Sequence, residues 1–149
     1  MDRSRLAAEI EYEVGQLRKL AEHARQLSAI PEGERRPWDA AAAAKYIADI
    51  SHALENMCRR CYAALGLPVP GGSDCHSQIL GDFLTEPSLG QRLAPEVPAR
   101  LKRYLAFRHR FIHGYAHEVT WGIVAEPLAL IPETVDALAA VWLKWLKTL

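Results

Sequence analysis

The sequence has little that would cross-link the chain or hold it in a membrane. Its three cysteines among 149 residues are an odd number, and their spacing fits no disulfide framework, so we expect a protein of the reducing cytoplasm. No apolar run is long enough to span a bilayer, and the N-terminal segment lacks the continuous apolar stretch of a signal peptide. Lys and Arg together number 18, as do Asp and Glu, so the net charge is zero and any site for a polyanion must be a local patch.

Helical periodicity runs through almost the whole chain, and no segment alternates as a strand does. Half of the residues are apolar, which fits a single folded domain over residues 1–149. Apolar residues recur at intervals of three and four, and alanines, which favour helices, fill one segment. Loops rich in proline and glycine separate these segments. We therefore predict an all-α bundle of four to five helices, over residues 2–28, 39–65, 75–84, 96–113 and 132–149.

The C-terminal third is more apolar than a small monomer requires. Trp142 and Trp145 are three residues apart and follow Trp121. Aromatic residues at this spacing can fill a core, and they are also enriched at interfaces between proteins. The sequence leaves both roles open and admits a homodimer.

One segment concentrates positive charge, because residues 99–117 contain no Asp or Glu. A solvated helix end explains part of this charge, since cations in a last turn offset the helix dipole. It does not explain Arg108, which follows Leu101 by seven residues and Leu105 by three and so shares their apolar face. An arginine on that face needs an anionic partner, and no acid lies within residues 99–117 to serve it. A substrate phosphate is one candidate.

These residue types suit cleavage of a phosphodiester bond in RNA. Arginine clamps a phosphate with two N–H groups, histidine exchanges protons near neutral pH, and tyrosine stacks on bases. Such a reaction needs neither a metal ion nor a cofactor. On a straight helix, however, Arg108 and His113 lie about 140° apart. To act together they need a break at Gly114 or a second copy of the chain.

The stretch RHRFIHGY, residues 108–115, resembles the R-x4-H-x-Y signature of the HepT-like toxins, which belong to the HEPN superfamily of all-α ribonucleases. The hydrophobic residue before the arginine, the apolar pair before the histidine and the order of the helices are also similar. The resemblance implies a metal-independent endoribonuclease that acts as a homodimer. It also implies a partner, an MntA-like nucleotidyltransferase antitoxin.

The resemblance implies a role for each residue of the motif. Arg108 contacts the scissile phosphate, His113 is the general acid or base, and Tyr115 is the residue to which the antitoxin adds AMP. Many members of the family carry Asn directly after the motif arginine, where this chain has His109. His109 is therefore an auxiliary candidate and a rival of His113 for the role of acid or base.

Two further residues are auxiliary candidates, and a cysteine pair is not. Arg110 adds charge within the motif, and Glu55, in helix 39–65, is placed to orient a motif residue. Cys58 and Cys61 resemble half of a zinc site, but they lie on the apolar stripe of their helix, so we interpret them as buried thiols. His76 receives no role beyond a place at the edge of the cleft.

Two functions of other classes remain open. A non-catalytic helical HEPN subunit would bind a nucleotidyltransferase and help to position its substrate. A plain helical dimerisation module would bind neither RNA nor a nucleotidyltransferase. Loss of RNA cleavage in Arg108→Ala and His113→Ala would distinguish the enzyme from both.

Overall fold

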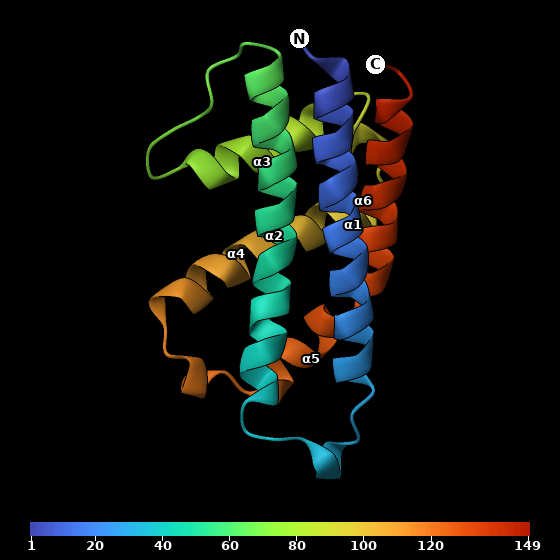
Figure 1. Cartoon of the computed structure of the whole chain (residues 1–149). Helices are drawn as coiled ribbons and strands as arrows, with labels where there is room; N and C mark the ends of the chain where they lie inside the picture. The colour runs from blue at the N-terminus through green and yellow to red at the C-terminus, as the bar shows by residue number, and fades with distance from the viewer.

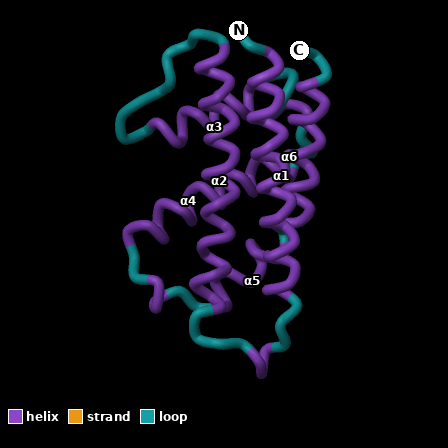
Figure 2. The backbone as a smooth tube through the Cα atoms, in the orientation of Figure 1, coloured by secondary structure: helices purple, strands orange, loops and turns teal.

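All regular structure in this protein is helical. The structure, a computed structural model, describes every residue from Met1 to Leu149 and contains six α-helices, three short 3-10 helices and no strand (Figures 1 and 2). In chain order the elements are α1 (Arg3–Ser28), η1 (Glu32–Glu34), α2 (Asp39–Ala64), α3 (Cys75–Thr85), η2 (Gly90–Arg92), α4 (Glu96–His113), η3 (Ala116–Glu118), α5 (Trp121–Ala129) and α6 (Ile131–Leu146). The predicted all-α bundle is confirmed, and α1 to α4 lie within one residue of the predicted ranges.

Helices α1, α2 and α6 run side by side, while α3 and α4 cross behind α2 (Figure 1). The two termini lie at the same end of the molecule, where the guanidinium of Arg3 donates to the carbonyl oxygen of Leu149 at 3.2 Å. No helix has both the length and the apolar composition that crossing a bilayer requires.

The α1–α2 pair forms the frame against which the other helices pack. Asp2 directly precedes α1, and its carboxylate accepts a hydrogen bond from the N–H of Arg5 at 3.0 Å and so caps the helix. On α2 the buried positions Ala43 and Ala44 carry only methyl groups, which lets neighbouring helices approach closely. Alanine also favours the helix itself, so the same residues supply both propensity and packing.

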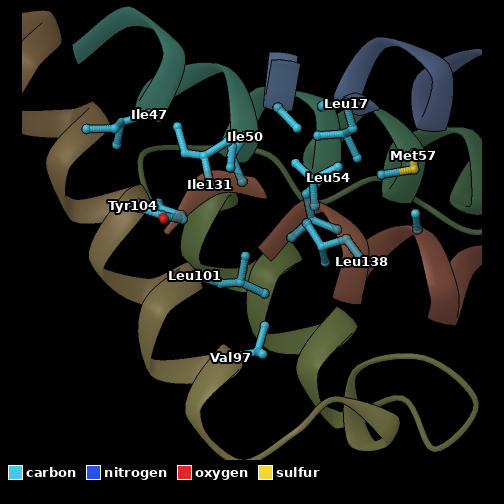
Figure 3. Packing of buried hydrophobic residues seen from close by; sticks show 14 of the residues in the cluster. Leu17, Ile47, Ile50, Leu54, Met57, Val97, Leu101, Tyr104, Ile131 and Leu138 are labelled. Carbon is cyan, nitrogen blue, oxygen red and sulfur yellow. The ribbon is translucent and has the colours of Figure 1, made fainter. Parts of the chain in front are cut away.

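A single hydrophobic core fixes which face of α4 is turned inward (Figure 3). Leu101 and Tyr104 of α4 are buried in it together with Ile50 and Leu54 of α2. The hydroxyl of Tyr104 donates to the carbonyl oxygen of Pro127 at 2.8 Å, so its one polar atom is satisfied. Helix α4, which carries Arg108 and His113, is therefore fixed in its rotation about its own axis.

The C-terminal segment divides into two helices at Leu130, which ends α5 and begins α6. Pro132 stands in the first turn of α6, where its missing N–H costs no helical hydrogen bond. Helix α6 corresponds to the predicted fifth helix, whereas α5 was not predicted.

The tryptophans of α6 belong to the packing of the monomer. Trp142 is 0% exposed, and its ring stacks on Phe83 of α3 with a centroid distance of 5.7 Å. Trp145, which is partly buried, meets the edge of Trp142 at 5.5 Å. Trp142 is thus a residue of the core. For this tryptophan the structure decides between core and interface, which the sequence left open.

Candidate active site

Arg108 is paired with an acidic residue of α2. It lies one turn beyond Tyr104 on α4, its side chain is only 18% exposed, and its Nη1 is 3.6 Å from Oε2 of Glu55. The anionic partner that its apolar position requires is therefore supplied by the chain itself, from a different helix. Glu55 lies beside Arg108, one of the motif residues that it was expected to orient.

Glu55 is the centre of a network of three basic side chains. Its Oε1 accepts a hydrogen bond from Nε of Arg59 at 2.9 Å and forms an ion pair with Nη2 of Arg59 at 2.8 Å, and its Oε2 lies 2.6 Å from Nδ1 of His76. Burial by itself would raise the pKa of the Glu55 carboxyl, but the hydrogen bonds from His76 and Arg59 outweigh burial and lower this pKa. The hydrogen bond to Glu55 in turn raises the pKa of the Arg59 guanidinium. We call Glu55, Arg59, His76 and Arg108 the Glu55 network.

The remaining motif residues line an open groove at the end of α4. This motif groove, of about 440 Å³, is bordered by the last turns of α4, by η3 and by the start of α5. The imidazoles of His109 and His113 meet edge to face there, with centroids 4.7 Å apart. Tyr115 is 70% exposed and stacks on His117 at 5.5 Å. The motif groove also includes the side chains of Phe107, Arg110, Phe111, Glu118, Val119 and Ile123.

Within one chain, Arg108 and His113 do not come together. Arg108 belongs to the Glu55 network and does not line the motif groove, whereas His113 does line it. Helix α4 continues to His113, and the backbone leaves it only at Gly114, with extended angles of φ −106° and ψ 177°. The helix therefore keeps the two side chains on different faces, as a separation of five residues requires, and a break at Gly114 does not unite them.

Two residues of the Glu55 network were missed from the sequence. Arg59 follows Glu55 by four residues, which is the spacing of helical ion pairs and could have identified it. His76 carries no comparable signal, because its return to α2 depends on the path of the loop over residues 65–74. The sequence predicts for His76 only a place at the edge of the cleft, whereas in the structure its contact with Glu55 is closer than that of Arg108.

The cysteines of α2 pack in the interior. Cys58 is buried, and Cys61 is partly buried against the core. Burial raises the pKa of both thiols, that of Cys61 to about 12. No three His, Cys, Asp or Glu side chains converge in an arrangement that could hold a metal ion. The interpretation of this pair as packed thiols is confirmed for Cys58.

Comparison with known proteins matches the chain to a family. The family model for the HepT-like proteins matches residues 42–149, a range that includes the whole Glu55 network and the whole motif groove. No curated protein and no solved structure matches the chain. The family match covers most of the sequence and all of the residues singled out above, and the helical fold agrees with it. The chain therefore belongs to the HepT-like proteins of the HEPN superfamily.

Proposed function

We propose that this protein is the toxin of a toxin–antitoxin pair and that it cleaves RNA in the cytoplasm as an endoribonuclease, without a metal ion. Membership of the HepT-like family supports a HEPN-type component of a toxin–antitoxin pair. The observation that carries RNA cleavage is the motif groove, because it gathers His113, Arg110 and Tyr115 at an exposed surface. These side chains offer proton transfer, phosphate binding and base stacking, the interactions that RNA cleavage uses.

His113 and Arg108 carry the proposed reaction. His113 takes the proton of a ribose 2′-hydroxyl while the 2′-oxygen attacks phosphorus, or it gives a proton to the departing 5′-oxygen. The bond between phosphorus and the 5′-oxygen breaks, which leaves a 2′,3′-cyclic phosphate and a 5′-hydroxyl. Arg108 donates to the non-bridging oxygens as negative charge grows on them. His109, in ring contact with His113, is the proposed second proton carrier.

A homodimer reconciles this reaction with the geometry. Because Arg108 and His113 lie on different faces of α4, the proposed active centre takes Arg108 from one chain and His113 from a second chain across a shared cleft. Ile112 and Ile123 are exposed beside the motif residues, and they offer apolar surface that such a contact would bury.

Tyr115 is the proposed point of control. Its large exposed fraction makes the phenol available to a nucleotidyltransferase antitoxin of the MntA kind. The antitoxin would transfer AMP from ATP to the phenol oxygen and release pyrophosphate. The added nucleotide would place bulk and negative charge in the motif groove, where it would repel the phosphates of RNA.

RNA cleavage by the purified, unmodified chain in excess EDTA tests the proposal. We expect cleavage by the wild type, and a fall in kcat/KM of about 100-fold or more in His113→Ala and in Arg108→Ala. His23→Ala and Arg18→Ala change exposed residues of α1 and are the matched controls, which should cleave as the wild type does. RNA carrying 2′-O-methyl groups should resist, because its 2′-oxygen has no proton to lose.

Each outcome decides between functions. Absence of cleavage by the folded, unmodified wild type would overturn the toxin proposal and favour a non-catalytic subunit that docks on a nucleotidyltransferase. Cleavage that EDTA abolishes would retain the ribonuclease and overturn its metal independence. Cleavage that persists in His113→Ala but stops in His109→Ala would transfer the role of acid or base to His109.

A further inference from the structure

His76 and Arg108 approach the same oxygen of Glu55 at unequal distances. Nδ1 of His76 lies 2.6 Å from Oε2, whereas Nη1 of Arg108 lies 3.6 Å from it. The first distance is that of a strong hydrogen bond to a charged group, and the second is too long for a hydrogen bond. His76 therefore holds Oε2, while Arg59 holds Oε1 with a hydrogen bond from Nε and an ion pair from Nη2.

The contact between Nη1 of Arg108 and Nδ1 of His76, at 3.3 Å, can be a hydrogen bond only in the tautomer in which Nδ1 accepts. A guanidinium nitrogen can only donate, and Nδ1 must donate its own hydrogen to the carboxylate of Glu55. Two donors thus face one oxygen, and the nearer one occupies it. The guanidinium of Arg108 is left close to a negative charge without being fixed by it.

Removal of the His76 ring would free Oε2. The guanidinium of Arg108 would then close on it and form the direct, charge-assisted pair that arginine makes with carboxylates. A guanidinium bound in this way has fewer N–H groups to offer a phosphate. The adjoining carboxylate would also repel an incoming anion more strongly once His76 no longer offsets it.

We propose that His76 is a positioning residue that keeps Arg108 available to an RNA phosphate by occupying Oε2 of Glu55. This inference rests on the proposed ribonuclease function and adds to it a residue of α3 that lies outside the R-x4-H-x-Y motif. In this role His76 does not touch RNA or transfer a proton in the reaction. Without His76, RNA must draw Arg108 away from Glu55 as it binds, so binding should weaken, while the chemical step in the bound complex stays largely unchanged.

Steady-state cleavage separates this role from a merely structural one. We expect His76→Ala to raise KM about tenfold while kcat changes little. His76→Asn should restore most of the loss, because its amide N–H₂ reaches about the position of Nδ1–H. Glu55→Gln, added to His76→Ala, should also restore binding, because a neutral amide holds Arg108 less firmly. Circular dichroism checks that each variant is folded, and the 42% exposure of the His76 side chain favours tolerance of these changes.

Two results of this experiment would overturn the role of His76. One is an unchanged KM in His76→Ala. The other is a double variant, His76→Ala with Glu55→Gln, that binds RNA no better than His76→Ala alone. That result would show that holding of Arg108 by Glu55 does not cause the loss of binding.

A measurement without RNA distinguishes this inference from the proposed function. Rotation about the Cζ–Nε bond of Arg108, followed by nitrogen NMR, is slow when the guanidinium is fixed by a carboxylate. We expect slower rotation in His76→Ala than in the wild type, and faster rotation again once Glu55→Gln is added. Equal rates in the wild type and His76→Ala overturn the positioning role, whatever the cleavage assay gives. Absence of cleavage by the wild type, in contrast, overturns the ribonuclease.

Discussion

At the scale of single residues, the carboxylate of Glu55 makes the stability of the fold depend on pH. Burial opposes its ionisation, but His76 and Arg59 together hold the pKa of Glu55 below its ordinary value of 4.5. The stabilisation from this group is fully present above its pKa in the unfolded chain and is lost as the pH falls through the lower folded pKa. We expect the free energy of unfolding to fall more steeply in the wild type than in Glu55→Gln between about pH 5 and pH 3. Urea unfolding at a series of pH values measures this.

A matched substitution shows whether the effect belongs to Glu55. Glu11 is exposed on α1, so Glu11→Gln should keep the slope of the wild type. At neutral pH Glu55→Gln should also lower the free energy of unfolding by about 1–2 kcal/mol, because Arg59 and His76 lose a charged acceptor. If the free energy of unfolding changed with pH in parallel for the wild type and Glu55→Gln, this would contradict the lowered pKa of Glu55.

The same residues show how far side-chain placement can be predicted. Arg108 could be placed on the apolar side of its helix, because helical geometry ties it to Leu101 and Leu105. The angle between Arg108 and His113 followed from the same geometry. The contact between His76 and Glu55 did not, because it joins residues 21 apart through a turn that no periodic pattern describes.

At the scale of elements, Gly90 marks the place where η2 meets α3 most closely. A Cβ at Gly90 would collide with the carbonyl oxygen of Phe83 and the Cα of Leu84, which are backbone atoms and cannot turn aside. We expect Gly90→Ala to lower the free energy of unfolding by about 2 kcal/mol or more. Thermal unfolding followed by circular dichroism measures the change.

Gly15 provides the comparison for this prediction. It lies within α1, and a Cβ there would meet no atom within 4 Å. Gly15→Ala should therefore raise the free energy of unfolding by about 0.5–1 kcal/mol, because alanine favours the helix. Equal effects of the two substitutions would show that contact with the α3 backbone is not what Gly90 avoids.

The helices that the sequence pattern predicted have longer buried stripes than α5, the helix that it missed. Helices α1, α2 and α4 have stripes of buried residues long enough to show the helical period in the sequence. Each of these helices is bounded by proline, glycine or a capping residue. Helix α5 has nine residues, one of which is Pro127. Contacts from elsewhere in the chain help to hold it, since the guanidinium of Arg35 lies 4.0 Å from the ring centre of Trp121 and Tyr104 donates to the carbonyl oxygen of Pro127. Such contacts leave no trace in the local sequence.

At the scale of the whole molecule, the separation of Arg108 from His113 predicts complementation between chains. We expect a homodimer with twice the 16.7 kDa mass of the chain, which light scattering would measure. A mixed dimer of Arg108→Ala and His113→Ala chains should regain about half of the wild-type cleavage, because one of its two shared centres has both residues intact. The two homodimeric variants should remain inactive.

The mixed dimer can be isolated with a different affinity tag on each chain. If both residues of a centre came from the same chain, every centre in the mixed dimer would lack one of them, and cleavage would not return. A chain that stays monomeric while it cleaves RNA would also contradict a shared centre.

The meeting of the two chain ends gives this protein a natural point of attachment. Arg3 and Leu149 lie at one end of the helical frame, whereas the turn that carries Tyr115 leaves α4 on another side (Figure 1). A dye, a surface tether or a fused reporter domain at either end would stand clear of the motif groove. Immobilised in this way, the chain would keep Tyr115 facing the solution, so the proposed transfer of AMP could be followed on the same molecules.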